Sequence, residues 1–91
     1  MLVSASALAQ TNITVQVESK DEGEAIEGAT VNIERTNITG YTDSNGVAVL
    51  FSVPDTAEHI IVSYLGYYRK KVKLAKGQAK IEVKLEEQEE E

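Results

Sequence analysis

The sequence predicts an all-β domain folded as a seven-stranded antiparallel β-sandwich. Short segments in which apolar and polar residues alternate recur along the chain, and such alternation is typical of strands with one buried face. Turn residues separate these segments about every 8–12 residues, which is the spacing expected for a sandwich. No part of the sequence carries the apolar stripe of a helix.

The first three expected strands are short. Residues 13–18 and 31–34 place Ile or Val at every second position and Thr, Asn, Gln or Glu between them, so each strand has one face to bury. A charged, glycine-containing segment, residues 19–28, joins them and is expected to form a loop. Residues 39–42 are a shorter third strand, which leads into the polar turn 43–46.

The fourth expected strand, residues 47–53, is apolar at nearly every position. Such a run is typical either of a central strand, buried on both faces, or of a strand with an exposed apolar patch. Pro54 ends it, because proline has no N–H to donate to a neighbouring strand. The remaining expected strands, separated by Gly66 and by a turn around Gly77, are residues 59–65, 67–74 and 80–85.

Length, composition and charge restrict the function. The 91 residues make one domain, which buries roughly 60–65% of its unfolded surface. Cysteine is absent, which excludes disulfides and thiolate metal sites, and the single histidine, His59, excludes any site with several histidines. A net charge of −6 argues against nucleic acid as a partner, because binding it needs a basic face. No run reaches the ~18 apolar residues that a membrane-spanning helix needs.

The chain is expected to have three parts. Residues 1–9, MLVSASALA, are small and apolar and end in Ala-Leu-Ala, which is the pattern at the end of a secretory signal peptide. We therefore expect secretion across the inner membrane and a mature domain over residues 10–85. Residues 86–91 are all glutamate except for one glutamine and are expected to form a disordered acidic tail, because they can bury no apolar surface.

The polar turn 43–46, DSNG, has two interpretations. A calcium loop needs several oxygen ligands and a distal bidentate glutamate, whereas Asp43 is the only carboxylate in the segment 35–54. A turn needs only that Asp43 accepts backbone N–H groups and that Asn45 and Gly46 tolerate positive φ. We therefore interpret the segment as the turn of a hairpin and predict no metal site.

His59 is the strongest candidate for a general base. Asp55 and Glu58 are near it in the sequence, but catalysis also needs a nucleophile and a donor for the developing oxyanion. The candidate hydroxyls, Ser52 and Ser63, lie within strand patterns and have no catalytic motif around them. We expect His59 to be a capping or exposed residue, the protein not to be an enzyme, and no cofactor to be bound.

Three motifs occur in order along the chain: GATV at residues 28–31, TDSNG at 42–46 and VSYLGY at 62–67. On these motifs the chain, from about residue 12 to residue 85, resembles the carboxypeptidase-regulatory-like domain family. The resemblance implies a transthyretin-like or immunoglobulin-like β-sandwich without catalytic residues of its own. The motif residues expected to have structural roles are Gly28, Asp43, Asn45, Gly46, Tyr64, Gly66 and Tyr67.

The VSYLGY version of the third motif is similar to that of the domain ahead of the plug in many TonB-dependent outer-membrane receptors of Bacteroidetes. Together with residues 1–9, this similarity implies a non-catalytic accessory domain that mediates protein contacts on the periplasmic side. Two alternatives stay open: a stand-alone ligand-binding or adhesion module outside the cytoplasm, and the structural companion of a zinc carboxypeptidase domain. The sequence does not indicate an oligomeric state.

Basic residues gather in one part of the chain, because all of them except Lys20 and Arg35 lie between Arg69 and Lys84. The sixth expected strand carries four candidates for contact with an anionic partner: Arg69, Lys70, Lys71 and Lys73. A structural role also accounts for them, since lysine on an edge strand discourages pairing with other strands.

Other surfaces are candidates for partner contact as well. Two interpretations apply to Tyr64, Tyr67 and Tyr68. They could form an aromatic platform that binds a peptide or glycan, or they could pack against apolar surface. The remaining candidates are an open sheet edge, the face with Phe51 and Val53, and the loops 21–27 and 55–59.

Overall fold

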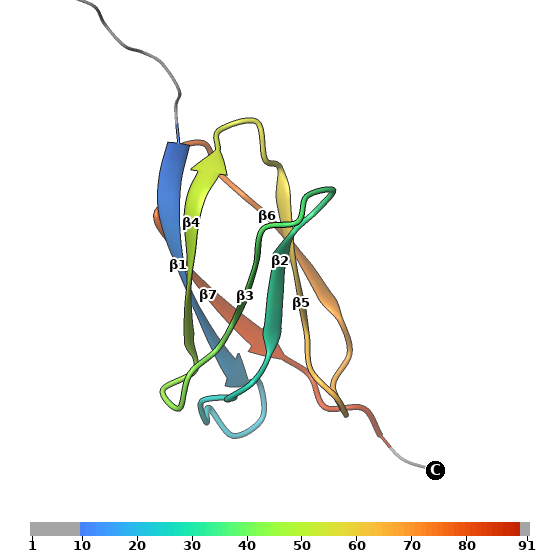
Figure 1. Ribbon diagram of the computed structural model, residues 1–91. Coiled ribbons are helices and arrows are strands. Elements are labelled where there is room, and N and C mark those ends of the chain that lie inside the picture. Colours follow the sequence, from blue (N-terminus) through green and yellow to red (C-terminus); the bar gives the residue numbers. More distant parts are fainter. Residues whose placement is uncertain (1–9, 90–91) are drawn as a thin grey trace, which may run out of the picture.

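The computed structural model describes residues 10–89, and within this range the chain is all-β, as predicted. No helix in this range is long and apolar enough to cross a membrane. The expected signal-peptide remnant, residues 1–9, lies outside the described residues. The strands (Figure 1) are β1 (Gln10–Ser19), β2 (Thr30–Ile33), β3 (Thr39–Tyr41), β4 (Val47–Pro54), β5 (His59–Ser63), β6 (Lys70–Lys73) and β7 (Lys80–Leu85).

The strands form two layered sheets (Figure 1). One sheet has the strand order β4-β1-β7 and the other the order β3-β2-β5-β6. The pairings within them are antiparallel, except that β1 and β7 run parallel, with Val17 opposite Val83. β7 enters its sheet from β6 of the other sheet, so no hairpin forces it to run against β1. The predicted β-sandwich is confirmed, with one parallel pairing that the sequence pattern did not indicate.

Alternating side chains of both sheets fill the space between them. Every second residue of β1, β2, β5 and β7 points inward, as the alternation predicts. Burying these side chains stabilises the fold by about 25 cal/mol for each Å² of apolar surface removed from water. The buried apolar residues are Ile13, Val15, Val17, Ile26, Ala29, Val31, Ile33, Ala48, Leu50, Val53, Ile60, Val62, Leu74, Ile81, Val83 and Leu85.

Two buried hydroxyls hold the loop that precedes β2. Thr42 Oγ1 accepts the backbone N–H of Ala29 at 2.8 Å and donates to the carbonyl oxygen of Ile26 at 2.6 Å. Ser19 Oγ, at the end of β1, accepts the N–H of Glu22 at 3.2 Å. Since buried polar groups are costly without partners, these bonds allow both hydroxyls to lie in the core.

The connection between β5 and β6 is longer than predicted. β5 ends at Ser63 and β6 begins only at Lys70. The N–H of Tyr67 donates to the carbonyl oxygen of Tyr64 at 3.0 Å and closes a turn between the two strands. The residues that were expected to extend both strands therefore form this turn and an arm that leads into β6.

The acidic tail departs from the expected disorder in its first residues. Residues 86–88 run antiparallel to residues 66–68, with backbone hydrogen bonds of 2.9 and 2.8 Å at the two ends of the pairing. Backbone groups make these bonds, so the charge of the glutamate side chains does not prevent the pairing. Residues 90–91 lie outside the described range.

Candidate interaction surfaces

The polar turn between β3 and β4 is held by Asp43. Its Oδ1 accepts the N–H groups of Asn45 at 2.9 Å and of Val47 at 3.0 Å, as the turn interpretation predicts. Gly46 has a φ of 77°, and its carbonyl oxygen accepts the N–H of Val17 at 2.7 Å. This bond directs the chain onto β1. β3 and β4 therefore lie in different sheets, and the turn is a corner between sheets rather than the expected turn of a hairpin.

The VSYLGY motif forms the turn after β5. Gly66 adopts a φ of 90°, which a residue with a side chain rarely adopts. The ring of Tyr64 lies against Gly28, and its centroid is 5.8 Å from that of Tyr67. Tyr67 packs against the core, where desolvation, together with the nearby carboxylate of Glu87, raises its pKa.

The three tyrosines of this region divide between packing and exposure. Tyr67 is half-buried, whereas Tyr64 and Tyr68 are 39% and 50% exposed. Leu65, at the tip of the turn, is 93% exposed. The packing interpretation therefore describes Tyr67, while Tyr64, Leu65 and Tyr68 are exposed.

Glu34 links His59 and Lys71 across the outer face of the four-stranded sheet. Glu34 Oε1 lies 3.3 Å from His59 Nδ1, and Oε2 lies 3.0 Å from Lys71 Nζ. The hydrogen bond with Lys71 lowers the pKa of Glu34. Sequence proximity had indicated Asp55 and Glu58 as neighbours of His59. The observed partner follows β2, and only the pairing of β2 with β5 reveals it.

The candidate hydroxyls lie apart from this network. Ser63, opposite Thr30, lies at the far end of β5 from His59, and Ser52 lies in β4 of the other sheet. Within residues 10–89, His, Asp and Glu side chains form no group of three or more that could hold a metal ion. The network is therefore an ion pair between Glu34 and Lys71, with His59 beside the same carboxylate, on an open sheet face.

β6 is an edge strand, paired with β5 on one side only. Lys71 and Lys73 are exposed, while Val72 between them packs against the core. The N–H of Leu74 donates to the carbonyl oxygen of Glu58 at 2.8 Å. Because backbone groups alternate in direction along a strand, those of Lys71 and Lys73 point away from β5. The basic strand thus lies at a sheet edge, as the edge-protection interpretation requires.

A groove beside the start of β6 gathers basic side chains from three parts of the chain. Its lining residues are Lys20, Tyr68, Arg69, Lys70, Lys84 and Glu86. Lys70 Nζ donates to the carbonyl oxygen of Lys84 at 3.3 Å. Lys84 Nζ donates to Glu18 Oε1 at 2.9 Å, and this bond raises the pKa of Lys84. The sequence pattern did not indicate that Lys20 and Lys84 belong to this groove, because only the parallel pairing of β1 with β7 brings their side chains to it.

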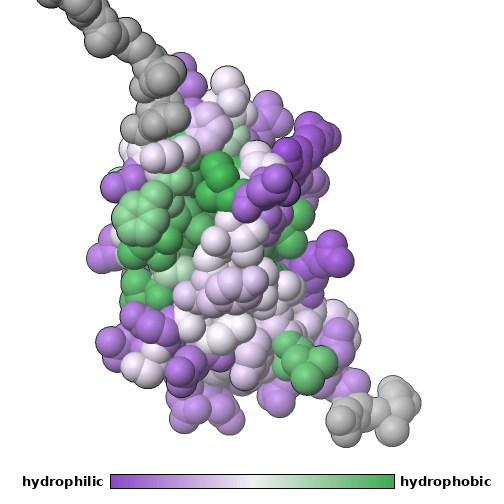
Figure 2. Space-filling view, viewed as in Figure 1, coloured by the Kyte–Doolittle hydropathy of each residue, from purple (hydrophilic) through white to green (hydrophobic). Residues whose placement is uncertain are grey.

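β4 is an edge strand of the three-stranded sheet and carries apolar side chains into solvent. Val49 and Phe51 are 41% and 65% exposed. Figure 2 shows apolar surface gathered on the β4 side of the molecule. Of the two interpretations of residues 47–53, the exposed apolar patch is therefore the correct one.

Val53 does not share this face, contrary to the prediction. Ser52 adopts a φ of 56°, and its N–H donates to Asn12 Oδ1 at 3.0 Å. The register of β1 and β4 shifts at Asn12, so Phe51 and Ser52 lie opposite one residue and form a β-bulge. The bulge turns Val53 into the core, where it is 2% exposed.

The two candidate loops are anchored by one apolar residue each. In the loop 21–27 only Ile26 is buried, and its N–H donates to the carbonyl oxygen of Val17 at 3.0 Å. In the loop 55–59 Ala57 packs against the core. The other side chains of both loops face solvent or lie partly exposed.

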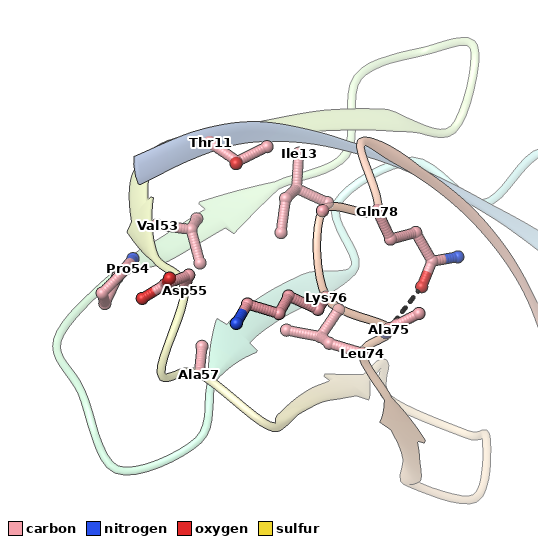
Figure 3. Close-up of a pocket in the computed structure, with 11 residues that line it drawn as sticks. Thr11, Ile13, Val53, Pro54, Asp55, Ala57, Leu74, Ala75, Lys76 and Gln78 are labelled. Carbon is pink, nitrogen blue, oxygen red and sulfur yellow. Dashed lines mark hydrogen bonds between the residues drawn. The ribbon is translucent and has the colours of Figure 1, made fainter. Parts of the chain in front are cut away.

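A small pocket opens between the ends of β4 and β6 (Figure 3). Ile13, Val53 and Leu74 supply its apolar lining, and the N–H of Ala75 donates to Gln78 Oε1 at 3.0 Å. Its cavity of about 20 Å³ has room for roughly one water molecule. The pocket is too small for a substrate or cofactor.

Solved structures share this architecture. A chain of a type II cohesin–X-dockerin complex from Acetivibrio cellulolyticus, a C-terminal interface mutant, is similar with a TM-score of 0.64 at 20% identity, over 81% of this chain and 52% of that chain. The TIE protein of Bacillus anthracis is similar with a TM-score of 0.56 at 22% identity, over 86% of this chain and 16% of that chain. This chain thus spans about half of the first and a small part of the second.

At these identities the structural likeness indicates the fold alone. No curated protein matches the chain in sequence. Residues 13–91, in contrast, match the CarboxypepD_reg-like domain. Since this match covers most of the chain, the protein belongs to the CarboxypepD_reg-like domain family.

Proposed function

We propose that this domain is a non-catalytic interaction module on the periplasmic side of the outer membrane, as the N-terminal accessory domain of a TonB-dependent receptor. Family membership is the observation that carries the proposal, because the family resemblance implies a sandwich without catalytic residues of its own. The VSYLGY motif at residues 62–67 supports the receptor setting, and the pattern of residues 1–9 supports export. Residues 10–85 are then the mature accessory domain.

The environments of the polar candidates support a role without catalysis. Asp43 is occupied by two backbone N–H groups and holds a turn. His59 lies beside the carboxylate of Glu34, which forms an ion pair with Lys71, and this arrangement is not a nucleophile paired with its base. Both residues thus have structural explanations for their positions.

Exposed features support contact with a protein. β6 has a free edge, and open sheet edges are used for binding extended peptides. Phe51 and Leu65 expose large apolar side chains at two separate places. A chain of the cohesin–X-dockerin complex shares the architecture, so a sandwich of this kind is compatible with membership of a protein assembly.

The genomic reading frame around the coding segment is the first test. A plug and barrel encoded after the codon for Glu91 is the expected result. A zinc-peptidase domain encoded before this segment would favour the carboxypeptidase companion, and a stop codon after Glu91 would favour the stand-alone module.

Photo-crosslinking in cells is the second test. A crosslinking amino acid is placed singly at Phe51, Leu65 and Lys73, which lie on three different surfaces. We expect a defined periplasmic or outer-membrane protein to be captured from one surface and not from all three. Absence of any specific crosslink, together with normal receptor function after in-frame deletion of residues 10–85, would refute the proposal.

A search for turnover tests the non-catalytic part. The full chain and its His59→Ala variant are compared on ester, amide and glycoside substrates. We expect no turnover by either protein. Turnover by the full chain that is lost in His59→Ala would make the domain an enzyme.

A further inference from the structure

The free edge of β6 presents backbone groups that can pair with another strand. The backbone N–H and C=O groups of Lys71 and Lys73 point away from β5. Within residues 10–89, no strand pairs with this edge of β6. Lys71 and Lys73 together thus offer two backbone donors and two backbone acceptors. A strand added to a sheet edge forms hydrogen bonds with groups spaced in this way.

The side of the sandwich formed by β3 and β4 is less open. At Gly40 of β3, a Cβ would lie only 2.9 Å from Leu50 Cδ2 of β4 and 3.7 Å from the carbonyl oxygen of Val49. The edges of β3 and β4 therefore approach one another, as their neighbouring positions in Figure 1 also show. A strand added there would have to separate the two sheets.

Basic side chains predominate at the edge of β6. Lys71 and Lys73 project from the outer face of this strand. Within residues 10–89, Lys71 has an ion-pair partner, Glu34, whereas Arg69, Lys70 and Lys73 have none within 4.0 Å. The groove at the start of β6 adds Lys20 and Lys84, of which Lys84 is paired with Glu18, and its lining also includes Glu86.

An acidic segment of the chain already makes an isolated bridge just before β6, outside the sheet itself. Residues 86–88, Glu-Glu-Gln, run antiparallel to residues 66–68, immediately before β6. Their backbone bonds measure 2.9 and 2.8 Å. The internal pairing ends where β6 begins, so the edge from Lys70 to Lys73 is left for another strand.

We propose that the edge of β6 binds an extended acidic strand of a partner protein, with main-chain hydrogen bonds to Lys71 and Lys73. This inference rests on the proposed function and names the chemistry of the partner. Side chains of the added strand opposite Lys71 and Lys73 lie on the outer face, so these positions favour glutamate or aspartate. The position between them faces Val72 and favours an apolar residue. The expected partner sequence is therefore acidic–apolar–acidic.

The same charges disfavour other occupants. A second copy of this chain would place lysines of one β6 opposite lysines of the other, and directly opposed like charges destabilise a strand pair. Nucleic acid and anionic membranes are repelled at longer range by the net charge of −6. A short acidic strand contacts the local positive charge at β6, and because it is small it comes close to few of the negative charges elsewhere on the protein.

The test is a titration of the isotope-labelled 91-residue chain, followed by amide chemical shifts. The probe is the peptide Ac-TEVEVEVT-NH2, and the matched control is Ac-TKVKVKVT-NH2. We expect the acidic peptide to shift the amides of Lys71 and Lys73, and the basic peptide to leave them unchanged at equal concentration. Absence of binding by the acidic peptide, or shifts confined to another surface such as β4, would overturn the inference.

Methylated peptides separate strand addition from simple charge attraction. The added strand is taken to run antiparallel to β6, so that its glutamates form hydrogen-bonded pairs with Lys71 and Lys73. N-methylation of the glutamates then removes the donors that face β6, whereas N-methylation of the valines removes only donors that face solvent. We expect the first peptide to bind at least about tenfold more weakly than the second, because the main-chain bonds supply much of the affinity. Equal affinities would overturn the inference.

Charge reversal on the protein completes the test. Lys73→Glu is chosen because Lys73 has no ion-pair partner among the described residues, and Lys76→Glu, in the turn after β6, is the matched control. We expect the dissociation constant for the acidic peptide to rise about threefold or more in Lys73→Glu and less than about twofold in Lys76→Glu. Equal effects of the two substitutions would contradict the inference.

The photo-crosslinking experiment distinguishes this inference from the proposed function. A partner captured from Phe51 or Leu65 but not from Lys73 would leave the interaction module in place and overturn the β6 site. Failure at all three positions, with no effect of deletion, would remove the proposed function itself.

Discussion

Replacing Gly46 by alanine tests whether the corner between the two sheets depends on a close approach of backbones. Gly46 has a φ of 77°, and a Cβ there would lie 2.6 Å from the carbonyl oxygen of Val17 and 3.0 Å from the Cβ of Ala25. Gly23 is the matched control. Its φ is 70°, but a Cβ at Gly23 would have no atom within 4 Å. The two substitutions share the backbone strain and differ in the collision.

The magnitude has two parts. Placing a side chain at positive φ costs about 1–2 kcal/mol at either position. At Gly46 the oxygen of Val17 must also move by about 0.8 Å to reach the 3.4 Å of ordinary contact. Val17 takes part in two backbone hydrogen bonds: its N–H donates to the carbonyl oxygen of Gly46 at 2.7 Å, and its carbonyl oxygen accepts the N–H of Ile26 at 3.0 Å. Weakening both bonds adds about 1–3 kcal/mol, so Gly46→Ala is expected to cost about 2–5 kcal/mol.

Thermal and urea unfolding of the full chain measure the difference. A domain of this size shifts its Tm by about 4–8 °C for each kcal/mol. We expect Gly23→Ala to lower the Tm by roughly 4–16 °C and Gly46→Ala to lower it by roughly 8–40 °C, or to prevent folding. If the two variants unfold at the same temperature, the collision with Val17 does not exist and the explanation of the corner is wrong.

Three further predictions test other parts of the structure. Asp43→Ala removes the acceptor of two backbone N–H groups and should lower the free energy of unfolding by about 1 kcal/mol, with Ser44→Ala nearly neutral and added calcium without effect on the Tm of the wild type. The pKa of Glu34 is lowered from its ordinary 4.5 in the folded state. Its contribution to stability is therefore present above pH 4.5 and is lost as the pH falls through the folded pKa, so Glu34→Gln should flatten the decline of stability in acid. Val53→Ala should destabilise by about 1–3 kcal/mol and Phe51→Ala by less than about 0.5 kcal/mol; similar losses would contradict the β-bulge.

The strands could be predicted because their information is local. In β1, β2 and β7, Ile, Val or Leu occupies every second position, and the structure buries those side chains. The turn at Asp43 was predictable for the same reason, because its hydrogen bonds reach only to residues two and four positions ahead.

The β-bulge in β4 could not be predicted, because it depends on a neighbour that is distant in sequence. Ser52 takes a positive φ while its N–H bonds Asn12, a residue of β1. Read by alternation alone, Phe51 and Val53 belong to one face. The bulge inserts one residue and sends Val53 to the other face, so the error follows from using a strict period of two.

The candidate surfaces were predictable only in part, for a related reason. The basic residues of the sixth expected strand were visible as a run, and the structure places them at a sheet edge. Lys20 and Lys84 join them only through the parallel pairing of β1 with β7. The partner of His59 follows β2, although the sequence indicated neighbours within its own loop. Contacts across strands need the register, and the sequence of one chain does not supply it.

The residues that identify the family and the residues that would select a partner are different sets. Gly46 is explained by a backbone approach and Asp43 by the hydrogen bonds of a turn. Neither structural role depends on what the domain binds. A match to these motifs therefore identifies the fold but does not indicate the partner. Lys71 and Lys73 lie outside the three motifs, at an edge where side chains change without disturbing the core. Related domains that differ mainly in the charge of β6 should therefore share this stability and differ in the strands they bind.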